Sequence, residues 1–146
     1  MDGSPVLIVD GANVVGSRPD GWWRDRAGAA VRLRDQLAAV AARGFQLAAL
    51  QPNGPLGPPG LLTHPEIILV TEGAARSVTS VPGVEVIPAP GSGDDKIVRV
   101  AAERSGHDRP VVAVTADREL RRRLAAYDVP AIGPGTLLRL ISPDQT

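Results

Sequence analysis

The chain has 146 residues, of which 43% are hydrophobic and 22% are charged, and these proportions are typical of one ordinary globular domain spanning 1–146. Its 16 Lys and Arg residues balance 16 Asp and Glu residues, which excludes a highly basic nucleic-acid coat protein and an acidic disordered tail. The absence of cysteine excludes disulfide frameworks, thiolate zinc sites and a cysteine nucleophile.

The first half of the chain predicts a buried strand, a long helix and an irregular stretch. Residues 5–9 form a continuous apolar run rich in β-branched residues, typical of a central strand in a parallel sheet. Helical spacing of apolar residues runs from about 23 to 43, and Gly44 stands where a C-cap is expected. Residues 45–50 fit a short strand or the tail of that helix, and we expect the strand. The stretch 51–65 holds five prolines and three glycines, so we expect a loop or lid there.

The second half predicts strands that alternate with helices. The expected strands are 66–71, 84–87, 110–115 and 129–132, and the expected helices are 94–104, 117–126 and 135–141. This alternation indicates one α/β domain with a mostly parallel sheet and a core over about 5–141. No apolar run approaches the ~20 residues that a membrane span needs, and the first residues lack a signal-peptide pattern. We therefore expect a cytoplasmic protein with no membrane partner.

Acidic residues follow the predicted strands, and ligands of open α/β sheets bind beyond the carboxyl ends of strands. They are Asp10, Glu72, the pair Asp94 and Asp95, and Asp117. We expect their carboxylates to converge at one sheet edge, where their mutual repulsion is costly unless a cation lies between them. Mg²⁺ is the natural candidate because it prefers carboxylate oxygens. If a cation neutralises these five acids, the rest of the surface carries an arginine excess of about five.

Each of these acids also has a structural interpretation as a helix N-cap. Asp94 and Asp117 both stand at predicted helix starts, where aspartate is a preferred capping residue. Asp10 differs, because Gly-Ala-Asn follows it and no helix is evident there. The acids therefore indicate a site as a group rather than singly.

Four segments, in order, resemble the motifs of NYN domains, particularly the YacP-like branch of the PIN-like nuclease superfamily. They are Val9-Asp10-Gly11-Ala12-Asn13-Val14-Val15-Gly16, Ile68-Leu69-Val70-Thr71-Glu72-Gly73, Gly93-Asp94-Asp95-Lys96-Ile97 and Val114-Thr115-Ala116-Asp117-Arg118-Glu119-Leu120. The resemblance extends over about residues 5–132. It departs from the family pattern at Glu72, where an aspartate is usual, and at 51–65, which does not align.

The resemblance implies a three-layer α/β/α fold and a metal-dependent endoribonuclease. It places one or two Mg²⁺ or Mn²⁺ ions on Asp10, on Asp94, Asp95 or both, and on Asp117, with Asn13 positioning the Asp10 loop or a metal-bound water. Glu72 would reach the metal directly, through water or not at all. A metal-activated water would hydrolyse the RNA phosphodiester in line and leave a 5′-phosphate, which agrees with the lack of a recognisable nucleophilic side chain.

Arginine side chains are candidates for contacts with the RNA phosphates. Arg18, Arg24 and Arg26 follow the Asp10 loop, Arg118, Arg121 and Arg122 can share one helix face, and Lys96 could contact the scissile phosphate. The alternative is a solvated surface whose arginines pair with neighbouring acids such as Glu119. Trp22 and Trp23 are candidates for base stacking or for packing against the core.

Two other functions remain as alternatives to a nuclease. An RNA-binding adaptor with a degenerate metal site is supported only by Glu72. A receiver-like phosphotransfer domain is disfavoured because Asp10 is a single acid and no lysine lies near the last strand. RNA is the expected partner, while homodimer formation and association with the ribosome or RNA-processing machinery stay open.

Overall fold

The computed structural model describes residues 4–46, 62–105 and 109–141. Five parallel strands form the central sheet in the order β5-β4-β1-β6-β7. The central strand β1 (Val6–Asp10) pairs with β4 (Glu66–Thr71) on one side and with β6 (Val111–Val114) on the other. The outer strands are β5 (Val84–Pro88) and β7 (Ala131–Ile132). The chain thus extends the sheet on one side of β1 before it crosses to the other.

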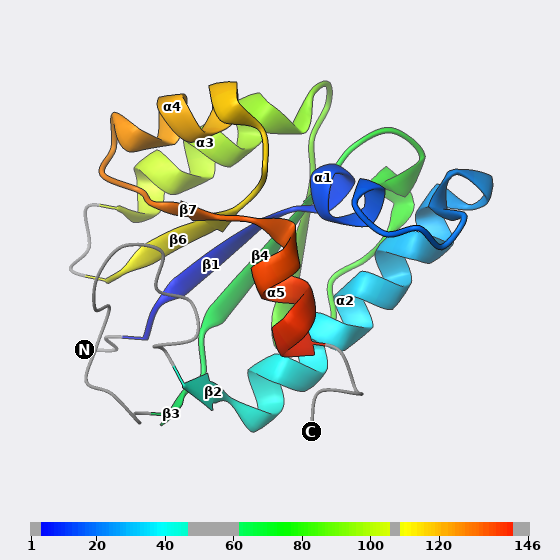
Figure 1. Ribbon diagram of the computed structural model, residues 1–146, viewed down its shortest axis with the longest axis horizontal. Helices are drawn as coiled ribbons and strands as arrows, with labels where there is room; N and C mark the ends of the chain where they lie inside the picture. Colours follow the sequence, from blue (N-terminus) through cyan, green and yellow to red (C-terminus); the bar gives the residue numbers. More distant parts are fainter. Residues whose placement is uncertain (1–3, 47–61, 106–108, 142–146) are drawn as a thin grey trace.

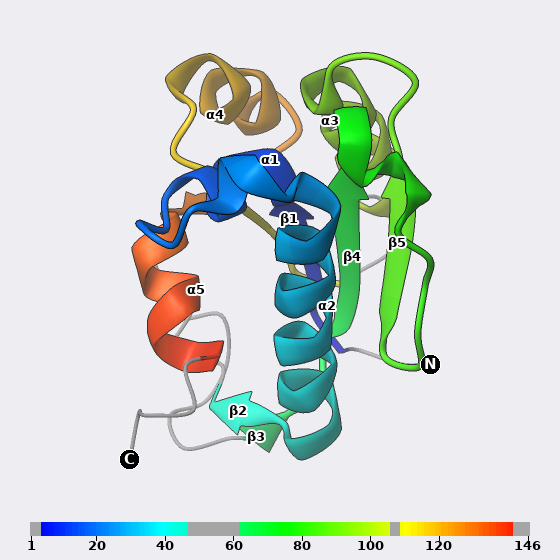
Figure 2. The same cartoon turned by 90° about the vertical axis from the view of Figure 1, so that its right-hand side faces the viewer.

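Helices cover both faces of this sheet (Figure 1). On one face lie α2 (Arg26–Arg43) and α5 (Pro134–Ile141), and on the other lie α3 (Gly93–Arg104) and α4 (Arg118–Ala125). The short α1 (Gly11–Gly16) begins directly at the end of β1, and Figure 2 shows it beside the top of α2. The three-layer α/β/α architecture with a parallel sheet is therefore confirmed.

Alternate side chains of β1 enter two separate cores. Leu7 and Val9 pack in the cluster that contains the buried residues of α2 and α5, whereas Val6 and Ile8 pack in the cluster of α3 and α4. All four side chains are at most 1% exposed. A strand buried on both faces needs apolar residues at every position, and this requirement explains the continuous apolar run in the sequence.

The structure differs from the sequence prediction in the first half of the chain. The helix predicted from about 23 begins at Arg26, because the Asp25 side chain accepts a hydrogen bond from Gly28 N–H (2.9 Å) as its N-cap. A 3₁₀ turn, η1 (Trp22–Arg24), precedes it. Of the strand predicted at 45–50, residues Phe45–Gln46 form β2, and 47–50 lie outside the described residues.

Part of the stretch predicted as a loop is a strand. Leu62–Thr63 form β3, which pairs antiparallel with β2, while residues 51–61 lie outside the described ranges. A 3₁₀ turn that the sequence pattern did not indicate, η3 (Gly73–Ser77), follows β4. Within the described residues, no helix is long and apolar enough to cross a membrane.

An ion-pair network lies at the amino end of the sheet. Glu66, the first residue of β4, accepts a hydrogen bond from Arg109 Nη1 (2.8 Å) and also pairs with Arg104. Burial raises the pKa of Glu66, but the hydrogen bonds from both arginines outweigh it, so the net pKa lies below the usual 4.5. The network joins β4 to α3 and to the segment before β6, at the opposite end of the sheet from the predicted site.

Candidate functional site

Four carboxylate side chains lie at the carboxyl edge of the sheet. Asp10 ends β1, Glu72 follows β4, Asp94 lies in the first turn of α3 after β5, and Asp117 lies between β6 and α4. Chain connections run in opposite directions from β1, because β4 and β5 extend the sheet on one side and β6 and β7 on the other. Such a switch in strand order is where open α/β sheets bind ligands.

The turn after Asp10 is built by the glycine that follows it. A Cβ atom on Gly11 would lie 2.6 Å from the carbonyl oxygen of Val70, so only glycine lets α1 begin this close to β4. Asp10 Oδ1 accepts a hydrogen bond from Asn13 N–H (3.4 Å) and is the N-cap of α1. The expectation that no helix follows Asp10 is therefore wrong, since α1 spans only six residues and carries little apolar periodicity.

Asp10 is a buried carboxylate, with 5% of its surface exposed. Burial, the largest cause, raises its pKa from the usual 3.8 to about 6. A hydrogen bond from Thr115 Oγ1 to Asp10 Oδ2 (2.9 Å) and the Asn13 N–H lower the pKa, whereas the charges of Asp94 and Glu72 raise it. Asp10 thus carries a negative charge at neutral pH at a substantial cost in free energy.

Thr115 and Asn13 tie the Asp10 turn to the Asp117 loop. The fully buried Thr115 hydroxyl donates to Asp10 and accepts from Asp117 N–H (3.1 Å). Asn13 Oδ1 accepts from Ala116 N–H (2.8 Å), so Asn13 holds the two loops together, as one of its predicted roles requires. The sequence analysis assigned no role to Thr115. The available signal was a hydroxyl directly after the four apolar residues of β6.

Asp94 and Asp117 differ in their use as helix caps. Asp117 Oδ1 accepts a hydrogen bond from Leu120 N–H (3.0 Å) and caps α4, as one interpretation predicted. The cap of α3 is Ser92, whose Oγ accepts from Asp94 N–H (3.2 Å). The capping interpretation of Asp94 is therefore wrong. Its carboxylate accepts no hydrogen bond from any described residue, and its pKa is raised by burial first and then by the charges of Asp117 and Glu72.

Glu72 and Asp95 occupy different positions relative to this cluster. Glu72 Oε1 accepts a hydrogen bond from Gly93 N–H (3.1 Å) and so braces the start of α3. The Asp95 side chain is 81% exposed and forms an ion pair with Arg123 (2.9 Å). Of the adjacent pair, Asp94 is the residue that faces the other acids. We call Asp10, Glu72, Asp94 and Asp117 the acidic cluster.

The predicted basic face of α4 is only partly available. Arg121 Nε donates to the carbonyl oxygen of Thr115 (2.9 Å), which fixes this side chain against the end of β6. Arg122 pairs with Glu119 on the same helix, as the alternative interpretation predicted. Arg118 is exposed and has no hydrogen-bond or ion-pair partner among the described residues. Arg118 is therefore the member of this set that is placed to contact a ligand.

The remaining basic candidates flank the site on other elements. Arg18 Nη2 donates to Gln36 Oε1 (2.7 Å), so this half-buried guanidinium joins the end of α1 to α2. Lys96 lines a shallow hollow beside Ser92 and Arg99 at the start of α3. Neither side chain forms a hydrogen bond or an ion pair with the acidic cluster.

Within the residues that the structure describes, no three Asp, Glu or His side chains stand close enough to ligate one metal ion as they are placed. The chemistry of the cluster still suits a divalent cation. Burial and mutual repulsion raise the pKa values of Asp10 and Asp94, and a cation between them would reverse both effects. These residues therefore fit Mg²⁺ or Mn²⁺ by charge and donor type.

Comparisons with known proteins support the fold. No family profile and no curated protein matches the chain by sequence. The solved structure of Rae1 (YacP) from Bacillus subtilis is similar, with a TM-score of 0.71 and 18% identity over 97% of this chain and 74% of that one. A point mutant of the same protein matches with a TM-score of 0.65 and 17% identity over 94% and 74%. The chain thus shares the three-layer α/β/α fold of Rae1 (YacP), which is the fold that its motifs led us to expect.

Proposed function

We propose that this protein is a metal-dependent ribonuclease that hydrolyses RNA phosphodiester bonds. The observation that carries the proposal is the acidic cluster at the switch in strand order. Placing several partly buried carboxylates together raises the free energy of the folded protein. A bound cation would offset this destabilisation, which gives the cluster a functional explanation. The resemblance of the motifs to the YacP-like branch, which shares this fold with Rae1 (YacP), points to RNA as the substrate.

Asp10, Asp94 and Asp117 are the proposed metal ligands. Glu72, which accepts a hydrogen bond from Gly93 N–H, is proposed to contribute its negative charge to the same site. When bound, Mg²⁺ or Mn²⁺ at such a site supplies a hydroxide-like nucleophile at neutral pH and stabilises charge on the phosphoryl oxygens. Thr115 and Asn13 hold the Asp10 and Asp117 segments in a fixed relation through the hydrogen bonds described above. Arg118 and Lys96 are proposed to bind RNA phosphates beside the cluster.

A cleavage assay with paired variants tests the proposal. The purified protein should cleave unstructured RNA with Mg²⁺ or Mn²⁺ and lose this activity in EDTA. Asp10→Asn and Asp117→Asn should abolish cleavage, because each removes a carboxylate from the cluster while keeping a capping side chain. Asp20→Asn, on an exposed residue far along the loop after α1, is the control for the loss of one negative charge.

The results separate the nuclease from the RNA-binding adaptor. Cleavage that persists in both cluster variants, or that does not respond to EDTA, would contradict the proposed site. RNA binding without cleavage across several divalent metals would favour an adaptor. Sites of cleavage on total cellular RNA would identify the substrate. Size-exclusion chromatography would test the homodimer, and co-sedimentation would test association with the ribosome.

A further inference from the structure

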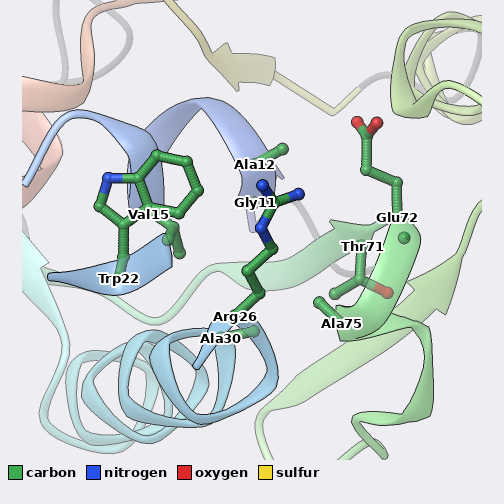
Figure 3. A pocket seen from close by; sticks show the side chains of 10 residues that line it. Gly11, Ala12, Val15, Trp22, Arg26, Ala30, Thr71, Glu72 and Ala75 are labelled. Atoms are coloured by element: carbon green, nitrogen blue, oxygen red, sulfur yellow. The ribbon is translucent and has the colours of Figure 1, made fainter. Parts of the chain in front are cut away.

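A pocket lies next to the acidic cluster but on the other side of Glu72 (Figure 3). It has a volume of about 180 Å³ and lies between α1, η1, the first turns of α2 and the segment after β4. Apolar side chains of Val15, Ala30 and Ala75 form much of its wall, and Gly11, which follows Asp10, borders it. The pocket is smaller than the roughly 300–1,000 Å³ of sites for drug-sized ligands, so it suits one planar ring system.

Trp22 and Arg26 give this pocket its chemical character. The guanidinium carbon of Arg26 lies 5.4 Å from the centroid of the Trp22 ring, and Figure 3 shows the guanidinium between that ring and Glu72. Arg26 forms no hydrogen bond or ion pair with any described residue. Thr71 also borders the pocket, and Figure 3 shows its hydroxyl on the side away from Trp22 and Arg26. The wall therefore combines an aromatic ring with a guanidinium that lacks a hydrogen-bond or ion-pair partner among the described residues.

This combination matches a nucleotide better than a purely apolar ligand. Bases stack on exposed aromatic side chains of single-strand-binding sites. A guanidinium binds phosphate oxygens through paired N–H donors, and Arg26 is free to do so. Because Glu72 belongs both to the pocket and to the acidic cluster, a base in the pocket would place its own phosphates near the cluster.

We propose that the pocket binds the base of an unpaired nucleotide adjacent to the scissile phosphate, with Trp22 contacting the base and Arg26 contacting a phosphate. The inference rests on the proposed ribonuclease function and specifies its substrate class. A paired base is stacked inside its helix, and extruding it costs the free energy of unpairing and unstacking. The pocket thus selects single-stranded RNA or a nucleotide displaced from a helix.

The tryptophan content allows a direct binding test. The chain has two tryptophans, so Trp23→Phe leaves Trp22 as the only one and Trp22→Phe leaves Trp23. Trp23 is 56% exposed and lies outside the pocket, which makes the second variant a matched control. Each variant is titrated with a short oligouridylate and with a blunt RNA duplex, in EDTA and in Ca²⁺, and fluorescence is recorded. Thermal unfolding confirms that each variant is folded.

We expect oligouridylate to quench Trp22 in the Trp23→Phe protein, with little response from the duplex or from the Trp22→Phe protein. Arg26→Gln should weaken oligouridylate binding roughly tenfold and reduce the slope of log K against log salt by about 0.7. Arg24→Gln is the matched comparison, because Arg24 lies over the Trp23 ring (5.9 Å) outside the pocket and should have a smaller effect.

Several outcomes would overturn the inference. These are absence of Trp22 quenching in both buffers, equal quenching by duplex, or wild-type affinity in Arg26→Gln. The binding-pocket proposal and the ribonuclease proposal can fail independently, because nucleotide binding is measured by fluorescence under conditions without cleavage. Cleavage without Trp22 quenching refutes the pocket alone. Quenching without cleavage in Mg²⁺ or Mn²⁺ supports the pocket and refutes the nuclease.

Discussion

Replacing Asp10 by Asn should stabilise the protein at neutral pH, although the same change should abolish cleavage. The carboxylate is 5% exposed, and burial is the main reason for its pKa of about 6. Asparagine removes the buried charge, and its one carbonyl oxygen can accept from Asn13 N–H, so α1 keeps its cap. Its Nδ2 then takes the place of the oxygen that accepts from Thr115, and the Thr115 hydroxyl can turn to accept from it. The substitution therefore removes the charge and rearranges one hydrogen bond, and only the charge gives a dependence on pH.

The magnitude and its pH dependence follow from the two pKa values. The folded protein holds the Asp10 proton up to about pH 6, whereas the unfolded chain releases it near 3.8. Between these values the folded state binds more protons, so the wild-type free energy of unfolding falls as pH rises. A shift of about 2 pKa units corresponds to about 3 kcal/mol. The advantage of the variant should be small at pH 4 and complete above pH 6.

Urea denaturation of both proteins in EDTA, across this pH range, measures the difference. Effects of other titrating groups cancel between wild type and variant where those groups are unaffected. Asp20→Asn should show no comparable gain, because the Asp20 side chain is exposed. A variant that is less stable than wild type at pH 7, or whose advantage does not change with pH, would refute the argument that burial raises the pKa of Asp10.

Three further substitutions test other parts of the structure, each by urea denaturation. Thr115→Val should lower the free energy of unfolding by about 1–3 kcal/mol because Asp10 loses its buried hydrogen-bond donor, whereas Thr115→Ser keeps the hydroxyl and should lose much less. Gly11→Ala should lower the free energy of unfolding by about 1–3 kcal/mol through the clash with the Val70 carbonyl oxygen. Gly91→Ala is the control and should leave the stability nearly unchanged, because a Cβ there meets nothing within 4 Å. Glu66→Gln should destabilise by about 1 kcal/mol at neutral pH. This last difference should vanish as pH falls below 4.5, because the wild-type ion pairs are lost when Glu66 is protonated.

The parallel sheet and its position in the chain could be predicted because buried strands impose a strong composition. Every residue of β1 and β6 is buried, so β6 and the part of β1 before Asp10 appear as unbroken apolar runs. The same topology places residues that follow strands at one edge. Asp10, Glu72 and Asp117 were found in this way without knowledge of any contact.

Features that depend on single close contacts could not be predicted. The helix α1 has six residues and no clear periodicity, and it exists because Gly11 permits a backbone approach to β4. The choice of Ser92 over Asp94 as the cap of α3 depends on a shift of two residues at the helix start. Short helices and caps are decided by geometry that hydrophobic patterns do not encode.

The role of Thr115 was missed for a related reason. Patterns of charge identify ionisable residues, while a buried hydroxyl that connects two of them leaves no such mark. The difference between Asp94 and Asp95 likewise requires the ion pair of Asp95 with Arg123, which joins two helices distant in sequence. Sequence spacing placed both acids at the site, but only the Asp94 side chain faces the other acids, while that of Asp95 is directed toward Arg123.

The zero net charge of the chain is the sum of a local group of negative charges and an excess of positive charges over the remaining residues. Four carboxylates lie together at the carboxyl edge of the sheet, and Asp95 does not join them because it pairs with Arg123. Without these four, 16 basic residues face 12 acidic ones, a smaller excess than the five that the sequence suggested. Arg118 and Arg26 contribute to this excess without hydrogen-bond or ion-pair partners among the described residues, and Arg26 lines the same pocket as Glu72 of the cluster. Repulsion of a polyanion is therefore local to the cluster, and a cation bound there would remove it.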